Sequence, residues 1–242
     1  EMAEGDGHLK TGSVRRLIVG EPIGVFYGYR FDGIFQNEEE CKQQTSSASP
    51  IGVGLRRYKD LNGDGKVDAA NDREILGDAN PKFFGGLTNT FAYKGFELNV
   101  FLQYSYGNKI LNYNAMELEN PTGGQNAYAD MVNRWTPENP SNIYPKATTN
   151  RALLVSDRFI EDGSYLKLKT LSLSYSFPKI NLKHIQGLRL YVTGQNLLTW
   201  TKYRGYDPEV SYRGASTLEA GEDFGGYPQS RTFMFGIKLD IK

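Results

Sequence analysis

The sequence has few residues of several kinds, and each scarcity excludes something. Cys41 is the only cysteine among 242 residues, so the chain forms no disulfide within itself. No run of about 18 apolar residues is present, which excludes a transmembrane helix. Membrane strands stay possible, because a barrel strand shows only an alternation over about ten residues. With 28 basic and 28 acidic side chains, no electrostatic argument favours a nucleic-acid partner.

Motifs for catalysis or phosphate binding are also missing. The chain has no G-x-S-x-G nucleophile elbow, and Gly52 and Gly54 lack the lysine and Ser/Thr of a phosphate-binding loop. Glu161 and Asp162 are adjacent carboxylates before a predicted strand, and a solvated hairpin end is a simpler interpretation than a glycosidase pair. We therefore expect a protein that is not an enzyme, with a β-rich hydrolase using Asp or Glu as an alternative.

Glycine, tyrosine and phenylalanine are plentiful, with 27, 16 and 13 residues. This mix favours strands separated by turns. In the segment RTFMFGIKLDIK, every second residue from Phe233 to Ile241 is apolar, and the alternate positions are mostly polar or small. Similar alternation predicts five long strands, and a sixth at 24–35; the five lie at 83–93, 96–107, 164–177, 188–200 and 230–242.

The segment at 164–177 changes phase within itself. Leu166 and Leu168 fall on the opposite phase from Leu171 and Leu173. Because side chains alternate with a period of two, an extra residue in the strand restores a common face. We expect a bulge or a change of surroundings near Thr170.

The links between the long strands alternate between short and long. Lys94 and Gly95 alone join the first two strands and 178–187 joins the second pair, whereas 107–164 and 200–230 are long. The strands, of about 11–14 residues, exceed the length of about 5–6 that is common in soluble sheets. Long strands with alternating short turns and long loops are typical of outer-membrane barrels.

A soluble β-sandwich with one wet face produces the same alternation of side chains. Strand length and loop asymmetry favour the barrel. Eight strands is about the smallest common membrane barrel, so five or six strands form only part of one. The alternative that stays open is a soluble extracellular sandwich, braced by calcium, that binds glycans.

Five stretches of the sequence, in a fixed order, resemble a known family. The ordered set closely resembles the C-terminal part of SusC/RagA-type TonB-dependent outer-membrane receptors, over nearly the whole chain. The opening EMAEGDGHLK resembles neither a start nor a cleavage site, so we expect a piece of a longer protein. The five stretches begin VGEPIG, DLNGDG, NRWTPE, RFIEDG and LRLYVT, at 19–36, 60–110, 133–146, 158–178 and 188–210.

The resemblance implies an all-β fold, a 22-stranded antiparallel transmembrane barrel with long extracellular loops. Residues 1–242 would supply its last five or six strands, in contact with lipid of the bacterial outer membrane. An N-terminal plug and the segment that contacts the TonB complex would lie outside this chain. The family further implies a SusD-like surface lipoprotein as partner and an oligosaccharide or a peptide as cargo. No individual cargo-binding residue is identified.

The stretch DLNGDGKVD, within the predicted extracellular loop at 36–82, has the spacing of an EF-hand-like calcium loop. Gly65 stands where such a loop turns sharply. Position 12, normally an acid, is Asn71, and Asp72 follows one residue late. Three outcomes are open: Asn71 binds the ion, Asp72 reaches in to bind it after a local adjustment, or the site is weak. The alternative is an Asx- and glycine-rich turn that holds no ion. The expected ligands of a structural Ca²⁺ are Asp60, Asn62, Asp64, Lys66 through its carbonyl, Asp68 and Asp72.

Overall fold

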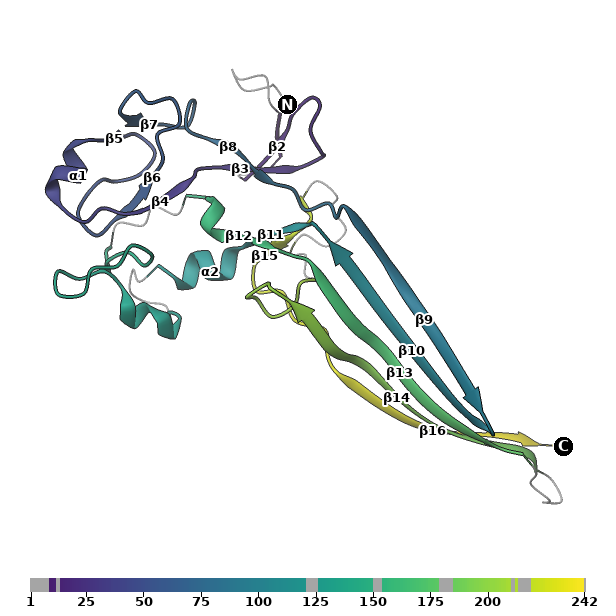
Figure 1. Cartoon of the computed structure of the whole chain (residues 1–242). Coiled ribbons are helices and arrows are strands. Elements are labelled where there is room, and N and C mark those ends of the chain that lie inside the picture. Colours follow the sequence, from purple (N-terminus) through teal and green to yellow (C-terminus); the bar gives the residue numbers. More distant parts are fainter. Residues whose placement is uncertain are drawn as a thin grey trace.

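The computed structural model describes residues 9–11, 14–120, 126–149, 154–178, 185–209, 212 and 219–241. These residues form mostly strands, with a few short helices. Five long strands make one extended sheet, which we call the large sheet, and a compact region stands at one end of it (Figure 1). We call this region the head; it contains the described residues outside the large sheet and its short turns. No helix among the described residues is long and apolar enough to cross a membrane.

The large sheet is an antiparallel meander. Each strand pairs with the next long strand along the chain, and β9 and β16 form the two edges. The alternation of apolar residues predicted all five strands, with boundaries within three residues of those observed. The strands are β9 (Phe83–Tyr93), β10 (Phe96–Tyr106), β13 (Tyr165–Phe177), β14 (Ile185–Thr201) and β16 (Thr232–Ile241).

The two ends of the large sheet differ in their connections. At the end far from the head, Lys94 and Gly95 join β9 to β10 (Figure 1). Both residues have a positive φ, 45° and 89°, as a two-residue hairpin turn of the mirror-image type requires. At the same end β13 finishes at Phe177 and β14 begins at Ile185, and residues 179–184 between them lie outside the described residues. The links from β10 to β13 and from β14 to β16 pass through the head.

The head is built from many short elements, several of them only two or three residues long. Before β9 these are β1 (Leu9–Thr11), β2 (Arg15–Leu17), β3 (Val25–Gly28), β4 (Phe31–Ile34), α1 (Glu38–Lys42), β5 (Thr45–Ser46), β6 (Arg56–Tyr58), β7 (Lys66–Val67) and β8 (Glu74–Gly77). After β10 they are β11 (Lys109–Asn112), α2 (Tyr113–Leu118), the 3₁₀ turns η1 (Ala129–Asn133) and η2 (Asp157–Phe159), β12 (Ile160–Asp162) and β15 (Glu222–Asp223).

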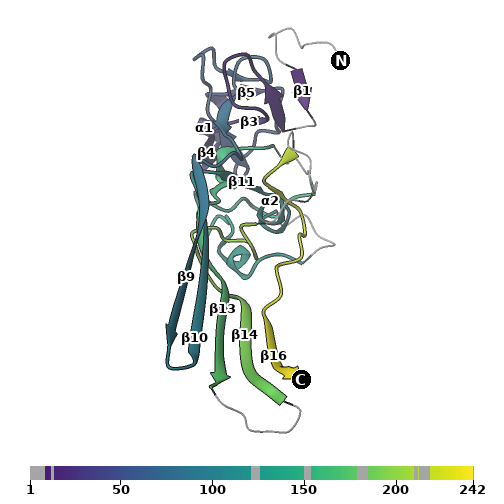
Figure 2. The same cartoon turned by 90° about the vertical axis from the view of Figure 1, so that its right-hand side faces the viewer.

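Segments distant in the sequence meet in the core of the head. One apolar cluster joins Phe26 of β3, Leu111 of β11, Met116 of α2 and Phe159 of η2, all at least 95% buried. The parallel pairing of β11 with β15 attaches the last long link to the same core. Figure 2 shows these elements stacked above the large sheet rather than across either of its faces.

The strand expected at 24–35 is two strands in two different sheets, so it is not a sixth strand of the large sheet. β3 pairs with β8, and β4 pairs with β6. Between them, the main chain of Tyr29 bonds to the segment after α2: its N–H donates to Val155 O at 3.0 Å, and its carbonyl accepts from Asp157 N at 3.2 Å. A change of pairing partner in the middle of the segment interrupts the strand.

Candidate functional site

The large sheet has one apolar and one polar face. Residues directly opposite each other in neighbouring antiparallel strands lie on the same face, so the register defines both. One row across the sheet is apolar throughout: Phe91, Leu98, Leu173, Val192 and Phe235. The neighbouring row on the opposite face is Thr90, Asn99, Ser172, Thr193 and Met234.

A bulge in β13 keeps the apolar face continuous. The register to both neighbours jumps from Leu168 to Thr170, which leaves Lys169 without an opposite residue. Leu166 and Leu168 thereby lie opposite Trp200 and Leu198, on the same face as Leu171 and Leu173. The bulge predicted near Thr170 is confirmed.

The apolar face is exposed. Phe235 is 81% exposed, Ile237 69% and Phe91 61%. No second sheet covers these side chains within the part of the chain that the structure describes. An apolar face in contact with water is unfavourable. Burial of this face against an apolar phase or another protein surface would therefore stabilise it.

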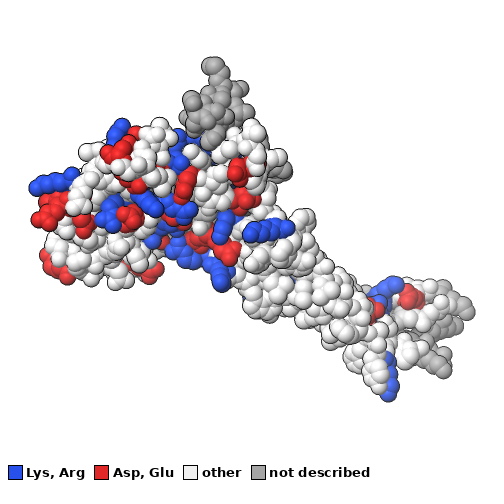
Figure 3. All heavy atoms as spheres, turned by 45° about the horizontal axis from the view of Figure 1, so that its top comes forward, with Lys and Arg blue, Asp and Glu red and all other residues white. Residues whose placement is uncertain are grey.

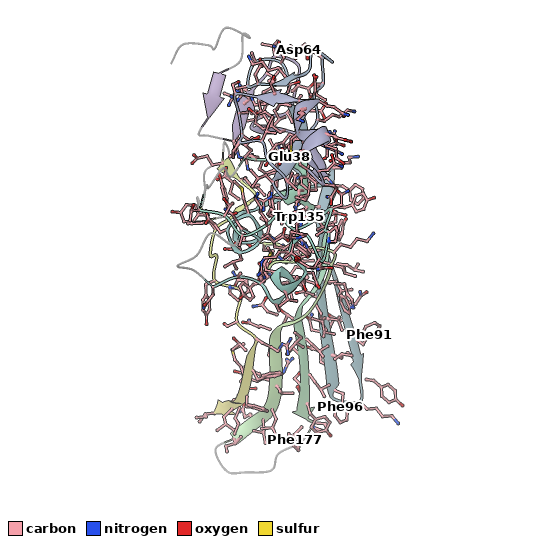
Figure 4. The ribbon with its side chains drawn as sticks, turned by 90° about the vertical axis from the view of Figure 1, so that its left-hand side faces the viewer. Glu38, Asp64, Phe91, Phe96, Trp135 and Phe177 are labelled. Atoms are coloured by element: carbon pink, nitrogen blue, oxygen red, sulfur yellow. The ribbon has the colours of Figure 1, made fainter. Side chains whose placement is uncertain are left out.

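Aromatic rings lie near both ends of the sheet. At the end with the tight turn, the ring centroids of Phe96 and Tyr175 are 4.5 Å apart, and those of Tyr175 and Phe177 are 4.8 Å apart. At the end next to the head, Phe83 stacks on Tyr106 at 4.8 Å. Figure 4 shows Phe96 and Phe177 at the far end of the molecule from Asp64.

Charged side chains are concentrated at the two ends of the molecule. Figure 3 shows them gathered on the head and at the far tip of the large sheet, with a stretch between that is almost free of charge on this face. At the tip, Arg189 pairs with Glu97 at 2.5 Å, and Lys238 lies near Asp240. In the middle of the large sheet, neither the row of Phe91 nor the row of Thr90 contains a charged residue.

A buried ionic clamp fixes the link after β14 to the polar face of the sheet, at the end next to the head. Lys167 Nζ lies 2.5 Å from both Asp207 Oδ1 and Glu209 Oε2, and the Lys167 side chain is only 2% exposed. Lys169, the bulge residue, adds a bond to Glu209 Oε2 at 2.8 Å. The main-chain N–H of Gln229 donates to Asp207 Oδ2, which holds the far part of the same link.

The clamp shifts the titration of its acids. Burial alone would raise the pKa of the Asp207 carboxyl, but hydrogen bonds from Lys167 and from the main-chain N–H groups of Glu209 and Gln229 outweigh it and lower this pKa. For Glu209, burial again opposes bonds from Lys167 and Lys169, and the pKa is also lowered. Both acids are therefore charged at neutral pH.

A second ionic network ties β12 to the start of the same link. Arg204 donates through Nε and Nη2 to Glu161 Oε1 at 3.0 and 2.8 Å, and through Nη1 to Glu119 Oε1 at 3.0 Å. Arg158 Nη2 reaches the other oxygen of Glu119 at 2.5 Å. The Glu161 side chain is only 10% exposed, so the interpretation of this acid as a solvated hairpin end is wrong. Its partners are positioned by the fold and not by the local sequence.

The DLNGDGKVD stretch curls around its first aspartate. Asp60 accepts main-chain N–H bonds from Gly63 and Gly65, both at 2.7 Å. Asn62 Nδ2 donates to Asp64 Oδ2 at 2.9 Å, and the Lys66 N–H donates to Asp64 Oδ1 at 2.8 Å. These bonds form a tight turn at the end of the head farthest from the tight turn of the sheet (Figure 4).

Asp72, rather than Asn71, closes the turn. It is fully buried and accepts main-chain N–H bonds from Leu61 at 2.8 Å and from Asp68 at 2.7 Å. The N–H groups of Ala70 and Asn71 donate to Asp68 Oδ1. The bond from Asn71 is the largest cause of a lowered pKa at Asp68, so Asp68 is a carboxylate at neutral pH.

The predicted ligands are therefore together in one turn, but each carboxylate is oriented toward main-chain N–H groups. Within the described ranges, no group of three or more His, Cys, Asp or Glu side chains is arranged to hold a metal ion. The oxygen-only donor set still suits Ca²⁺, because a carboxylate oxygen that accepts one hydrogen bond keeps a lone pair for a cation.

The residues of the two ionic networks carried only weak sequence signals. Asp207 and Glu209 belong to the stretch GYDPE, and their partner Lys167 lies 40 residues earlier than Asp207. Glu119 occurs in a polar stretch after α2 with no motif around it. Only the three-dimensional arrangement connects these residues with their partners.

Comparison with known proteins gives the same class throughout. The chain is 39% identical over 239 residues to TonB-dependent receptor P3 of Formosa agariphila, and 33% identical over 241 residues to receptor P26 of the same organism. These matches cover 96% and 97% of this chain and 24% of each relative. TonB-dependent receptor SusC of Bacteroides thetaiotaomicron is 28% identical over 192 residues, covering 76% of this chain and 17% of that protein. No protein-family model matches the sequence.

Solved structures agree in fold. The RagAB peptide transporter superposes with a TM-score of 0.75 at 24% identity, covering 96% of this chain and 24% of the matched chain. The same transporter in its open-open state gives a TM-score of 0.70. The chain is therefore homologous to a segment of TonB-dependent receptors, SusC among them, and its fold matches that of the RagAB transporter. It spans about a quarter of the length of the two Formosa agariphila receptors named above.

Proposed function

We propose that this chain is a wall segment of a transmembrane β-barrel in the bacterial outer membrane, and that the complete receptor imports a nutrient. The observation that carries the proposal is the exposed apolar face of the large sheet, backed by a polar face. In a transmembrane barrel the apolar face contacts lipid and the polar face lines the lumen.

The dimensions of the sheet support this placement. An eleven-residue strand such as β9 or β10 is about 37 Å long at roughly 3.4 Å per residue. At a tilt of about 40°, it crosses about 28 Å, close to the apolar band of outer-membrane barrels. The rings near both ends of the sheet are placed as interfacial girdles are, and the head then stands outside the cell.

Under this proposal the complete receptor is a 22-stranded antiparallel barrel with a plug. A SusD-like surface lipoprotein covers the head, and TonB supplies energy through segments outside this chain. The cargo is an oligosaccharide or a peptide. Support comes from the relatives alone: one is the SusC receptor, and one solved neighbour is the RagAB peptide transporter.

The alternative of a soluble glycan-binding sandwich lacks support. A sandwich buries its apolar face against a second sheet about 10 Å away. The head sheets stand at the end of the large sheet instead (Figure 2).

Neighbouring residues of one strand provide a matched test. In the complete receptor with Cys41→Ser, Phe235→Cys places a thiol on the apolar face and Met234→Cys places one on the polar face. In native outer membranes, we expect a photoactivatable lipid probe to label position 235 and not position 234. After extraction and mild denaturation, both thiols should react equally with a water-soluble maleimide. Equal lipid labelling at both positions, or at neither, contradicts the barrel.

We also propose that the DLNGDGKVD turn binds Ca²⁺ in a structural role. Asp60, Asn62, Asp64, Asp68 and the Lys66 carbonyl would supply oxygen ligands, and Asp72 would hold the two ends of the turn together. The double variant Asp60→Ala, Asp64→Ala should lose calcium-dependent protection of the 60–72 segment from protease. Asp32→Ala, elsewhere in the head, is the control. Equal cleavage of wild type and the double variant at every calcium concentration would sink the proposal.

A further inference from the structure

A small cavity in the head is lined by three residues, each with one polar atom that has no hydrogen-bond partner among the described residues. It has a volume of about 30 Å³. Arg56 and Tyr58 enter it from the same side of β6, and Asn120 enters from the chain just after α2. The unpartnered atoms are Arg56 Nε, the Tyr58 hydroxyl and Asn120 Nδ2, each cut off from solvent. Ser49, Pro50, Leu55, Pro145 and Thr148 complete the lining.

Arg56 is a buried cation without a carboxylate partner among the described residues. Its side chain donates to a main-chain carbonyl, that of Glu119, at 3.0 Å, and its guanidinium lies 5.5 Å from the centre of the Phe159 ring. The residue is 7% exposed. Burying a charge is costly unless an opposite charge compensates it, so a position of this kind calls for an anion.

The charged residues around Arg56 are already paired with one another. Arg158 and Arg204 are paired with Glu119 and Glu161, which accounts for two cations and two carboxylates. Arg56 is a further cation close to them, and its positive charge has no ion-pair partner among the described residues. A monovalent anion beside Arg56 would balance it.

The chemistry of the unpartnered atoms selects between an anion and a water molecule. A guanidinium Nε and an amide Nδ2 are donors only, and a phenol donates readily. A water molecule accepts two hydrogen bonds and must place its own two hydrogens on acceptors. Three donor groups from residues that line one cavity, one of them charged, suit a spherical acceptor with no hydrogens of its own.

We propose that this cavity is a binding site for a single monoatomic anion of the chloride class, held by Arg56, Tyr58 and Asn120. Its volume of about 30 Å³ has room for one water-sized species. The anion would join β6, from the segment before the large sheet, to the end of α2, from the segment between β10 and β13.

The protonation of Tyr58 agrees with this role. Burial raises the pKa of its phenol to about 12, against an opposing effect of Arg56. The hydroxyl therefore keeps its proton at neutral pH and is available as a donor. A tyrosinate would have supplied the negative charge itself and made an external anion unnecessary.

Bromide provides the direct test, because it replaces chloride and scatters X-rays anomalously. Crystals of the complete receptor grown in sodium bromide should show an anomalous peak within about 3.5 Å of Arg56 Nε and the Tyr58 hydroxyl, the usual donor–anion range. Ordered density without anomalous signal identifies a water molecule and overturns the proposal, as does an empty cavity.

A solution measurement separates binding from folding. Hydrogen–deuterium exchange of peptides covering β6 and the end of α2 is followed in chloride and in gluconate, at equal ionic strength. Chloride should slow exchange in the wild-type receptor. Tyr58→Phe removes one donor to a charged acceptor, and the chloride concentration for half-maximal protection should rise about tenfold.

Two arginine variants on β6 form the matched pair. Arg56→Gln should abolish the chloride effect. Arg57→Gln, which loses ion pairs with Asp32 and Glu40 on the other side of the strand, should keep it. If Arg56→Gln fails to fold, Tyr58→Phe still decides the matter, because it keeps the ring and removes only the hydroxyl. Protection that is identical in chloride and gluconate, or an unchanged response in Tyr58→Phe, contradicts the site.

Discussion

In the head, charged side chains are buried, whereas in the large sheet apolar side chains are exposed. Arg15, Glu119 and Asp72 are each at most 1% exposed, while Phe235 and Ile237 are 81% and 69% exposed. The large sheet thus reverses the usual distribution of residue types, while the head buries several charges beside an ordinary apolar core. The comparison shows that the head encloses its ionic networks, whereas the large sheet leaves one apolar face uncovered by the described residues, as the proposed contact with lipid requires.

The largest effect should come from breaking the clamp that joins the two parts. Lys167→Met leaves Asp207 and Glu209 buried without their shared cation, at a cost of about 3–5 kcal/mol. Protease protection of the 201–229 link, measured against urea concentration in the complete receptor, reports the loss. Lys169→Met is the control, because Lys169 is more exposed and bonds only to Glu209. An equal loss in both variants would show that the clamp does not depend on Lys167.

The next effect tests the two faces of the sheet. Leu173→Arg places a charge in the middle of the apolar face, and in a membrane it should cost about 2–4 kcal/mol. Ser172→Arg, one residue earlier, places the same charge on the polar face and should cost much less. The yield of heat-modifiable folded receptor in the outer-membrane fraction measures both. Comparable yields for the two variants would refute the assignment of the faces.

A smaller effect is expected at Gly236, where the ring of Tyr191 from the neighbouring strand occupies the place of a side chain. A Cβ at Gly236 would meet this ring at 2.1 Å. Gly236→Ala should therefore cost about 1–2 kcal/mol by overpacking. Tyr191→Ala in the same protein should recover most of this loss, and a double-mutant cycle on urea midpoints quantifies the coupling. Strictly additive effects would mean that the ring moves away freely.

The smallest effect is the pH dependence of the clamp. The folded-state pKa values of Asp207 and Glu209 are lowered, so their contribution to stability is complete above the ordinary carboxyl range near pH 4. It is lost as the pH falls through that range and below it. The loss should be smaller than in Lys167→Met, because protonated acids still form hydrogen bonds. Protection of 201–229 between pH 6 and pH 3 checks the sign. In Lys167→Met, burial without the cation raises the pKa of Asp207, so the loss of protection at low pH should shrink or reverse.

The sequence predicted the large sheet well because its signal is local. Each strand alternates over ten or more residues, and even the bulge at Lys169 shows as a change of phase. The tight turn at Lys94 and Gly95 was equally visible. Closure into a barrel was not derivable from these strands, and it rests on the relatives.

The head could not be predicted in the same way. Strands of two to four residues are too short for a periodic signal, and their partners lie far away in the sequence. Tyr29 illustrates this, because its main chain pairs with the segment around Ser156, more than a hundred residues later. Of the candidate site, the curl around Asp60 followed from spacing alone, and Asp72 was one of three options for closing it.

The unpaired edges of β9 and β16 limit how this part of the gene can be exchanged between related receptors. Each edge presents ten or eleven residues whose outward main-chain groups find no partner within the described chain. In an apolar medium such groups must be paired by neighbouring strands. In the proposed barrel the chain is therefore not an exchangeable module, and a gene fusion that transplants it must bring flanking strands of matching register. Exchange between relatives should be tolerated where the crossover points fall in the head, where the main chain makes its pairings within itself.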